Sequence, residues 1–476
     1  MRAQKQQRLM ENHRAVIVIG AGISGLVCAY RLKTLGIDVL LIEKNDRVGG
    51  VIQSERIDGY LIERGPNSSQ GTEELIALAE ELGIIDELIE GNPKAPAYVY
   101  FNGRLHPVPS GPGAFIKSNL LSPAGKLRIL KEPFVPRRQQ NSEESVAAFA
   151  RRRIGNEAAE RLVAPFVSGI YAGDADHLSV KAAFPRLANL ETDYGGLFRG
   201  MFAKAREARK AKKEASAVLD RAAPTRRRLC SFRSGMAFLP KTLAEKLGED
   251  LLTCCSELRV DRAPNQTGHM LEFERGGNRH QLTTDHLVIA APSNAAATLV
   301  GPISGELSDL LNEIDYPPLS IVSLAYKTST VRTTLDGFGF LVPPSEKMQI
   351  LGCVWNSSLF TDSAPTAMSL LTTFIGGARN PEAAHARDAE LVSTIHGELQ
   401  SALGISSEPG VIAITRYKRS IPQYNIGHFA RVQRIDSLLR GTPGIQLIGN
   451  YLHGVSTGDC IKEAERVAKS LAKTVN

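Results

Sequence analysis

The sequence predicts an α/β protein built around a Rossmann-like dinucleotide-binding unit, and three neighbouring features near the N-terminus carry this prediction. Residues 16–19 are a run of β-branched side chains, which is typical of a buried parallel strand. The turn that follows places Gly20, Gly22 and Gly25 in the pattern GxGxxG. A second strand, residues 38–42, then leads into an acidic residue. Strand, glycine turn, helix, strand and acid in this order predict a dinucleotide site.

The three glycines meet three different steric demands. The first allows a tight turn, the second lets a pyrophosphate approach the backbone, and the third lets the helix pack closely on the strand. Ile23 and Ser24 open that helix, whose free N–H groups and dipole favour an anion. Glu43 lies about twenty residues beyond the glycines, where it can bind a ribose hydroxyl. Its charge disfavours the 2′-phosphate of NADP.

Length and composition place the chain among ordinary globular proteins. Its 476 residues predict about two to three domains, and 43% hydrophobic and 22% charged residues are ordinary values. No apolar run approaches the roughly 20 residues that a membrane helix needs, and the N-terminal tail lacks the apolar core of a secretory signal. The six cysteines are scattered, which fits neither a disulfide framework nor a metal knuckle and favours a reducing, cytoplasmic location.

One segment carries the whole excess of positive charge. Residues 204–228 hold ten basic and three acidic residues, a net of +7, which equals the net charge of the chain. Such a run is usually a solvated helix or loop, with an anionic membrane surface or an anionic substrate as the alternative. No aromatic residues interleave with it, so we expect no nucleic-acid partner.

Glycine-rich turns continue after the second strand. Lys44, Arg47, Gly49 and Gly50 follow it, and the positive charge with bare backbone suits a second clamp on the pyrophosphate as well as a plain turn. Further on, Gly65, Pro66 and Asn67 form a turn after a short strand. Residues 72–82 then predict an amphipathic helix that Thr72 caps and that stops near Gly83.

A family resemblance rests on these motifs taken together. The order GAGISGL, Glu43, RVGG and ERGPN resembles the long flavin fingerprint of the superfamily of amine oxidases, phytoene desaturases and protoporphyrinogen oxidases, which bind FAD rather than NAD. Later stretches resemble protoporphyrinogen oxidases of the plastid and related bacterial forms. They include residues 95–110, 143–155, 164–185, 231–248, 337–344, 351–360, 371–380, 421–432 and 448–464. The resemblance covers essentially the whole chain after the first dozen residues.

The resemblance implies three regions. The first is a discontinuous FAD-binding domain of the p-hydroxybenzoate hydroxylase/amine oxidase type, at 14–90, 231–300 and 435–476. The second is a mixed-sheet substrate-binding domain at 91–97, 195–230 and 301–434, whose strands after Ser320 also follow from the pattern of apolar runs and turns. The third is a helical, membrane-associating domain at 98–194. Its apolar stretch 112–130 reads equally as a core helix or as a membrane-facing one.

The same resemblance assigns the residues that hold FAD. They are Gly20, Gly22, Ile23, Ser24, Gly25, Glu43, Lys44, Arg47, Gly49, Gly50, Gly65, Pro66, Asn67, Leu258, Gly449, Asn450, Gly454, Val455 and Ser456. Leu258 or Val260 is expected to pack on the adenine. A buried strand is expected at 444–450, and the segment that follows it begins the last helix. The free N–H groups at the start of that helix can contact the flavin.

Substrate positions also follow from the resemblance. Leu341, Val354 and Phe374 match residues that sandwich a tetrapyrrole, and Gly169 and Ala172 match backbone positions beside it. Asn67 matches a polar residue near the reacting carbon. Asn67 and Phe374 are thus assigned to the catalytic site as substrate-positioning residues, and no acid/base residue is identified.

One departure from the family concerns the substrate carboxylates. Where relatives commonly carry an arginine that pairs with a propionate, this chain has Ala97. Because an unpaired buried carboxylate is costly, another cation is expected to replace it or the carboxylates reach solvent. Arg64 and Lys94 are the two candidates, and the sequence does not rank them.

Two patterns typical of other chemistries occur in the chain. GVSTG at 454–458 matches the GxSxG motif that surrounds the nucleophilic serine of many hydrolases, here Ser456. It does not follow a strand directly, as that motif requires. His269 and Glu272 form an HxxE pattern without a third ligand, which reads as a solvated pair. Neither is expected to act, and no metal site is expected. Cys28 and Cys460 are expected to be core residues.

The expected function is therefore an FAD-dependent oxidase that converts protoporphyrinogen IX to protoporphyrin IX with O2 as acceptor and H2O2 as product. Oxidation of coproporphyrinogen III to coproporphyrin III is the first alternative, and a non-catalytic flavin-bound tetrapyrrole carrier is the second. The resemblance also implies peripheral attachment to the inner face of the cell membrane, a hand-off of porphyrin to a ferrochelatase, and a homodimer.

Overall fold

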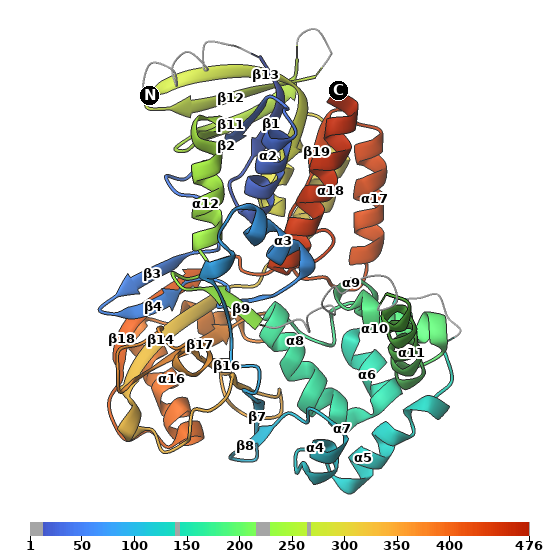
Figure 1. The fold of residues 1–476 in the computed structure, drawn as a ribbon, viewed down its shortest axis with the longest axis vertical. Coiled ribbons are helices and arrows are strands. Elements are labelled where there is room, and N and C mark those ends of the chain that lie inside the picture. The colour runs from blue at the N-terminus through green and yellow to red at the C-terminus, as the bar shows by residue number, and fades with distance from the viewer. Residues whose placement is uncertain (1–12, 139–142, 216–228, 264–267, 476) are drawn as a thin grey trace.

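The computed structural model describes residues 13–138, 143–215, 229–263 and 268–475. Figure 1 shows three parts: a sheet flanked by long helices at the top, a second sheet at the lower left and a group of helices at the lower right. The N- and C-terminal ends of the described chain both lie in the upper part.

The upper sheet has the parallel core that the sequence predicts. Its order is β10-β2-β1-β13-β12-β11, with β19 beside β13. The strands are β1 (His13–Ile19), β2 (Val39–Ile42), β10 (Leu251–Leu252), β11 (Ser256–Arg262), β12 (His269–Arg275), β13 (Asn278–Ile289) and β19 (Ile445–Leu447). β1 pairs in parallel with β2 and β13, and β19 extends the parallel part from the far end of the chain. Strands β11, β12 and β13 form an antiparallel extension.

Helices cover both faces of this sheet and bury two apolar cores. One core is formed with α2 (Ile23–Thr34), α3 (Glu73–Glu81), α12 (Phe238–Leu247) and α18 (Thr457–Val475). The other is formed with α13 (Ser293–Val300), α14 (Gly305–Asn312) and α17 (His428–Arg440). The predicted helix at 72–82 is confirmed as α3, and Thr72 caps it by accepting a hydrogen bond from Leu75 N.

The second sheet is mixed, as predicted. Its order is β18-β14-β17-β16-β15-β7-β8. The strands are β7 (Ala97–Phe101), β8 (Arg104–Pro107), β14 (Leu319–Lys327), β15 (Gly339–Leu341), β16 (Ile350–Trp355), β17 (Met368–Gly376) and β18 (Gly410–Tyr417). All neighbours are antiparallel except β15 and β7. Helix α16 (Asp388–Leu403) covers one face and buries a core there.

Two smaller sheets join the large ones. The hairpin of β3 (Ser54–Ile57) and β4 (Tyr60–Glu63) packs Tyr60 and Ile62 against the second large sheet. β5 (Ser69–Gln70), β9 (Leu229–Phe232) and β6 (Leu88–Glu90) form a three-stranded sheet at the centre of the molecule. The segment after β4 therefore runs between the two large sheets.

The helical part differs from its expected range at both ends. Residues 97–107 form the hairpin β7–β8 at the edge of the second sheet rather than helices. At the other end, α11 (Leu197–Ala215) packs against α10 (Pro185–Tyr194) and so belongs with the helices rather than with the substrate sheet. The apolar stretch 112–130 is two short surface helices, α4 (Pro112–Lys117) and α5 (Pro123–Leu130). Among the described residues, no helix is both long and apolar enough to cross a membrane.

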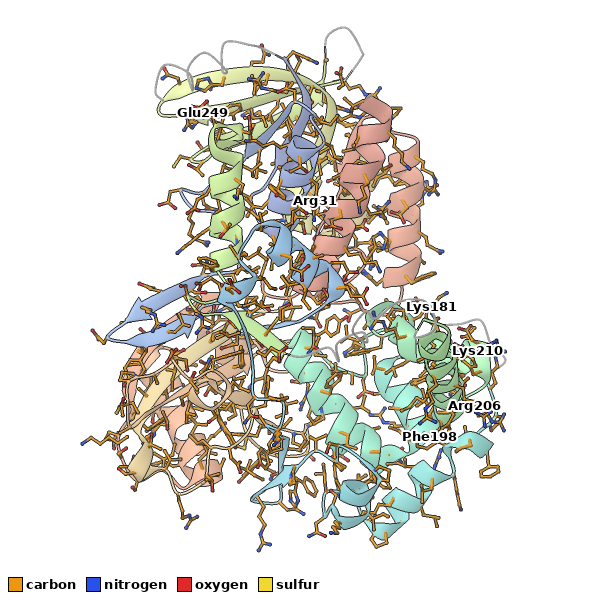
Figure 2. All side chains as sticks on the ribbon, in the orientation of Figure 1. Arg31, Lys181, Phe198, Arg206, Lys210 and Glu249 are labelled. Atoms are coloured by element: carbon orange, nitrogen blue, oxygen red, sulfur yellow. The ribbon has the colours of Figure 1, made fainter. Side chains whose placement is uncertain are left out.

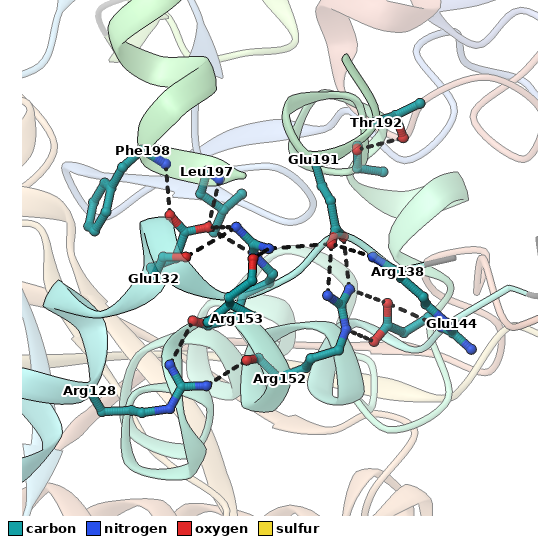
Figure 3. A network of polar contacts seen from close by, with 12 residues as sticks. Arg128, Glu132, Arg138, Glu144, Arg152, Arg153, Glu191, Thr192, Leu197 and Phe198 are labelled. Carbon is teal, nitrogen blue, oxygen red and sulfur yellow. Dashed lines mark hydrogen bonds and ion pairs between the residues drawn. The ribbon is translucent and has the colours of Figure 1, made fainter. Parts of the chain in front are cut away.

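A buried network of charges fixes how these helices pack (Figure 3). Arg153 on α6 (Val146–Ile154) donates from Nε to Glu132 Oε1 at 2.8 Å, and both side chains are fully buried. The same carboxylate accepts from Leu197 N at 2.7 Å and Phe198 N at 3.1 Å, at the start of α11. Because each ion has several partners, its desolvation is offset and the start of α11 is tied to α6.

Candidate flavin and substrate site

The N-terminal ends of two long helices meet beside the glycine turn. Helix α18 lies along α2, since Arg31 donates to Glu465 Oε1 at 2.6 Å and the thiol of Cys460 is hydrogen-bonded to Ser24. At the start of α18, a Cβ on Gly458 would lie 2.7 Å from Thr72 Cγ2, so the N-terminal end of α3 reaches the same place. Three helix N-termini therefore gather here, and their N–H groups and dipoles favour an anionic pyrophosphate.

The glycine turn itself is shaped by close contacts on one side and open space on the other. A Cβ on Gly25 would lie 1.9 Å from Gly20 O, so only glycine allows α2 to pack this closely. A Cβ on Gly22, in contrast, would meet no atom within 4 Å. The backbone of Gly22 is thus accessible to a ligand, as expected for the second glycine of a dinucleotide site.

Glu43 lies at the end of β2, where the ribose-binding acid is expected. Its side chain is buried, and Oε2 accepts from Ala21 N at 2.7 Å while Oε1 accepts from Asn45 N at 2.9 Å. Glu43 therefore also holds the glycine turn, which the sequence did not predict. A carboxylate oxygen offers two lone pairs, so Oε2 can still accept from a ribose hydroxyl.

The RVGG segment lies against the glycine turn. Gly49 N donates to Ala21 O at 2.8 Å, and Gly22 and Gly49 form an isolated parallel bridge. Arg47 is exposed and donates to Gly50 O at 2.8 Å, so it closes its own turn, and Lys44 is exposed as well. The glycine backbone of RVGG therefore lies beside the first glycine turn, as expected for a second pyrophosphate-binding segment. The role of Arg47 and Lys44 in binding stays a prediction.

The turn at 65–67 follows β4, which ends at the buried Glu63. A Cβ on Gly65 would lie 1.9 Å from Val51 O, so the turn packs directly on the backbone after RVGG. Glu63 accepts from Ser54 Oγ at 2.6 Å and from Met236 N at 2.8 Å. Burial raises the pKa of Glu63 to about 7, and these two hydrogen bonds oppose the rise.

On the adenosine side, the segment before β11 lies next to Glu43. Cys255 N donates to Glu43 O at 3.0 Å, and Cys254 N donates to Asn45 O at 2.9 Å. Of the two residues expected to pack on the adenine, Val260 is enclosed in the apolar core, whereas Leu258 is only partly buried. Leu258 is therefore the better placed of the two.

The C-terminal segment returns to the site through β19, which pairs with β13. Gly449, Asn450 and Gly454 lie in the loop between β19 and α18. Val455 and Ser456 then lead into the helix. Ser456 caps it, because Oγ accepts from Asp459 N at 3.1 Å and donates to Asp459 Oδ2 at 2.5 Å. The free N–H groups of the first turn of α18 are thus presented at the site.

Tyr424 holds this loop, a role that no sequence pattern revealed. Its buried hydroxyl donates to Asn450 O at 2.7 Å and accepts from Gly454 N at 2.9 Å, which joins the two ends of the loop. The ring of His428 stacks on Tyr424 at 4.1 Å between centroids, and burial lowers the pKa of His428 to about 4. Both residues lie in a stretch that resembles the family, and nothing in their spacing indicates this contact.

The three predicted sandwich residues lie on one face of the second sheet. Leu341 on β15 and Phe374 on β17 both pair with Gly352 on the strand between them. Val354 is two residues beyond Gly352 and so points to the same side. This is the face that α16 leaves free, because the side chains under α16 belong to the alternate positions.

Helix α8 (Ala164–Tyr171) approaches this face at its C-terminal end. A Cβ on Gly169 would lie 2.8 Å from Leu341 Cδ2, and Ala172, with a left-handed φ of 46°, packs in the cluster that includes Phe374. Phe374 also belongs to the neighbouring cluster around Val354. The five predicted substrate positions are therefore brought together from four separate stretches of the chain.

Asn67 lies at the border between the flavin segments and this face. Its Oδ1 accepts from Asn356 Nδ2 at 2.8 Å. Asn356 directly follows β16 and is buried, with 5% of its surface exposed. No local pattern indicates this partner, because the two asparagines are 289 residues apart.

The structure ranks the two cations proposed for the substrate carboxylates. Arg64 is already paired with Glu55 at 2.7 Å and donates to Thr415 Oγ1 at 3.1 Å. Lys94 is exposed, makes no ion pair with a described residue, and stands three residues before Ala97. Between them, Ala95 packs in the cluster with Val354 and Phe374. Lys94 is therefore the freer cation and the nearer along the chain to Ala97.

The patterns for other chemistries do not form sites. The hydroxyl of Ser456 is used in capping α18. His269 and Glu272 are three apart on β12 and therefore point to opposite faces, so they cannot share a ligand. The expectation that both are solvated is wrong for His269, which is buried and hydrogen-bonded to Pro443 O at 3.2 Å. Cys28 and Cys460 are buried, as expected, and burial raises the pKa of both thiols.

The pKa of Glu63 predicts a pH-dependent stability. Because its folded pKa of about 7 lies above the ordinary 4.5, the folded state binds more protons between these values. The stabilisation is present below pH 4.5 and is lost as pH rises through 7. We expect Glu63→Gln to gain stability over the wild type across this window, on the order of 3 kcal/mol. Thermal unfolding at pH 5 and pH 8 measures this, with Glu245→Gln at an exposed position as the control. If both variants changed the pH dependence of the unfolding temperature equally, the raised pKa of Glu63 would be contradicted.

The contacts of Tyr424 predict its effect on the cofactor. Tyr424→Phe removes both hydrogen bonds to the loop, and we expect the affinity for FAD to fall about tenfold. Titration of the flavin-free protein with FAD measures the Kd. Tyr326→Phe is the matched control, because Tyr326 is also buried, bonded to and stacked on a histidine, but under α16. A Kd that changes equally in both variants would refute the role of Tyr424.

The residues present fit an extended flavin dinucleotide. The open backbone at Gly22, the three helix N-termini and the free lone pair of Glu43 suit its pyrophosphate and ribose. The loop at 449–456 closes the other end of the site.

Comparisons with known proteins agree with this geometry. Residues 23–472 match the family of flavin containing amine oxidoreductases. The chloroplastic protoporphyrinogen oxidase of Nicotiana tabacum is 34% identical over 470 residues, covering 96% of this chain and 85% of that protein. The coproporphyrinogen III oxidase of Bacillus subtilis is 28% identical, covering 96% of this chain and 97% of that protein. A solved structure of a putative protoporphyrinogen oxidase from Exiguobacterium has a TM-score of 0.79 at 25% identity and covers 96% and 98% of the two chains. The chain belongs to the family of flavin-containing amine oxidoreductases, and its cofactor is FAD.

Proposed function

We propose that this protein is an oxygen-dependent oxidase that converts protoporphyrinogen IX to protoporphyrin IX. The observation that carries the proposal is the apolar sheet face formed by Leu341, Val354 and Phe374, with Gly352 between the first and the last. A large, mostly apolar macrocycle needs such a face, and the flavin segments end beside it at Asn67. The plant relatives named protoporphyrinogen oxidase support the same substrate.

The chain positions the substrate rather than performing acid/base chemistry on it. FAD, when bound, would accept the six electrons of the conversion as three pairs and pass each pair to O2, so that each porphyrin formed consumes three O2 and yields three H2O2. The apolar residues hold the ring plane, and they exclude water from it. Asn67 supplies a polar group at the edge of this face. The driving force comes from the substrate, because the product is aromatic.

Coproporphyrinogen III is the alternative substrate. It carries more carboxylates than protoporphyrinogen, so the two substrates differ in the cations they need. The tobacco relative named for protoporphyrinogen is 34% identical, against 28% for the Bacillus relative named for coproporphyrinogen, which favours the first.

We also propose that the helical part attaches to a membrane surface. Eight of the 14 exposed large hydrophobic side chains in the described chain lie here, namely Ile116, Leu127, Leu130, Phe134, Phe166, Leu187, Met201 and Phe202. Helix α11 adds basic residues, of which Arg206 and Lys210 are labelled in Figure 2. Apolar side chains beside basic ones fit a surface of anionic lipid. A cytoplasmic membrane face, the ferrochelatase hand-off and the homodimer stay predictions from the sequence, and residues 216–228 of the basic segment lie outside the described chain.

Anaerobic reduction tests the function directly. We expect the purified yellow protein to lose its flavin absorbance on mixing with protoporphyrinogen and to regain it, with porphyrin fluorescence, when air is admitted. Coproporphyrinogen should act more slowly at low concentration. Faster bleaching by coproporphyrinogen would move the assignment to the alternative substrate. If neither porphyrinogen bleached the flavin of a protein that holds FAD, the non-catalytic tetrapyrrole carrier would be the better interpretation.

The ranking of the cations predicts a change in KM. Lys94→Ala should raise the KM for protoporphyrinogen about two- to fivefold with little change in kcat, because the lost ion pair is exposed. Arg64→Gln should change KM less, since Glu55 already neutralises Arg64. Ala97→Arg should lower the KM of the Lys94→Ala variant. A larger effect from Arg64→Gln would reverse the ranking.

Vesicle sedimentation tests the membrane surface. The double variant Phe134→Ser and Phe202→Ser should weaken binding to anionic vesicles about tenfold or more, because both side chains are strongly exposed, at 83% and 71%. Leu35→Ser and Val411→Ser form the matched control, since both are exposed hydrophobic residues outside the helical part. Equal binding by both double variants would argue against attachment through these helices.

A further inference from the structure

The turn at residues 64–67 lies between the flavin segments and the second sheet. On the flavin side, a Cβ on Gly65 would lie 1.9 Å from Val51 O, so the turn packs directly on the backbone after RVGG. On the other side, Asn67 Oδ1 accepts from Asn356 Nδ2 at 2.8 Å, just beyond the end of β16. The turn is therefore in contact with the segments expected at both ligands.

Strand β18 holds the first residue of this turn at two points. The hydroxyl of Tyr417 donates to Arg64 O at 3.0 Å, and Arg64 Nη1 donates to Thr415 Oγ1 at 3.1 Å. The backbone carbonyl and the side chain of one turn residue are thus tied to alternate residues of one strand. Burial raises the pKa of Tyr417, while the charges of Arg47 and Arg64 oppose the rise. The hydroxyl therefore stays protonated at neutral pH and remains a hydrogen-bond donor.

The register of the sheet places both residues of β18 on the substrate face. Ile321 on β14 pairs with Phe374 on one side and with Thr415 on the other, so Thr415 and Phe374 point to the same side of the sheet. Tyr417 is two residues further along β18 and points there too. Its ring packs against the apolar cluster that includes Ala172 and Phe374. Tyr417 is therefore a residue of the substrate face whose hydroxyl reaches the flavin turn.

A tie between these two regions acts on the distance between cofactor and substrate. Reaction requires the reacting atoms to approach to about 3–3.5 Å, and a misplacement of about 1 Å can cost about 100-fold in rate. The proposed mechanism assigns no acid/base residue to the chain, so its contribution is the placement of the two ligands. Groups that fix the turn relative to the sheet therefore affect the rate more than the affinity.

We propose that Tyr417 is a positioning residue for the oxidation reaction, and that its hydroxyl, together with Thr415, holds the turn at 64–67 at the distance from the substrate face that flavin reduction requires. This inference rests on the proposed function and adds to it the residues that set the spacing between cofactor and substrate. The ring of Tyr417 contributes separately, as part of the apolar face.

Three substitutions separate the hydroxyl from the ring. Tyr417→Phe removes the hydroxyl and keeps the ring. We expect the limiting rate of anaerobic flavin reduction to fall about tenfold, while the Kd of protoporphyrinogen and the Kd of FAD each stay within about twofold. Thr415→Val removes the second tie and should lower the rate less, because Arg64 keeps its ion pair with Glu55. Tyr417→Leu also removes the ring, so it should raise the Kd of protoporphyrinogen as well.

Two kinds of measurement are needed. Stopped-flow reduction over a range of protoporphyrinogen concentrations gives the limiting rate and the substrate Kd, and titration of the flavin-free protein gives the Kd of FAD. Hydrogen exchange of the peptide 61–70 in the flavin-free protein needs no cofactor, and it should be faster in Tyr417→Phe than in the wild type. Tyr98→Phe is the matched control, because it removes a tyrosine hydrogen bond of 3.0 Å to Asp336 on the α16 side of the same sheet. It should leave the rate, both Kd values and the exchange of this peptide unchanged.

The outcomes distinguish this inference from the proposed function. A lower limiting rate with both Kd values kept, together with faster exchange of the turn, supports the inference. If Tyr417→Phe reduces its flavin as fast as the wild type, or if its Kd for FAD rises as much as its rate falls, the positioning role is refuted and the function stands. If no porphyrinogen bleaches the wild type, the function itself fails and this inference fails with it.

Discussion

The close packing of α2 on the turn after β1 is the constraint on which the rest of the structure depends. A side chain on Gly25 would enter the space of Gly20 O, so glycine alone lets the helix start directly at the turn. Helix α18 then lies along α2 through Arg31 and Glu465, and its first turn reaches Thr72. In this way α2 and α18, the first and last helices of the described chain, direct their positive ends to the place expected for the pyrophosphate.

A second use of glycine shapes the substrate face. Gly352 lies between Leu341 and Phe374 in the sheet, and Gly169 brings α8 against Leu341 from the other side. The absence of a side chain at these two points lets Leu341 pack closely between them, because a Cβ at either glycine would lie 3.0 Å or less from Leu341 Cδ2. The polar groups lie at the border of the face: Asn67 and Asn356 belong to segments that join the flavin site to the sheet. Their position between the flavin segments and the sheet, rather than their residue type, distinguishes them from other asparagines of the chain.

The helical part is organised by a buried network of charges in addition to an apolar core that includes Phe149, Val167 and Tyr171. Arg153 and Glu132 are fully buried, and Glu132 also receives the first N–H groups of α11. Buried ion pairs contribute little net stability but are costly to break, so the network favours one arrangement of these helices. That arrangement leaves apolar side chains such as Phe134 and Phe202 on the outside.

Local patterns in the sequence determined the dinucleotide unit, the helix capped by Thr72 and the strands after Ser320, because steric demands on glycine, capping and apolar alternation act over a few residues. The family resemblance added the flavin and the candidate substrate residues. Tertiary structure alone decided that Tyr424 holds the flavin loop, that Glu43 also holds the glycine turn, that residues 97–107 join the second sheet, and that Lys94 is less engaged than Arg64. It likewise paired Asn67 with Asn356 across 289 residues. Such contacts depend on where distant segments meet, and hydrogen bonds between them leave no periodic trace in the chain.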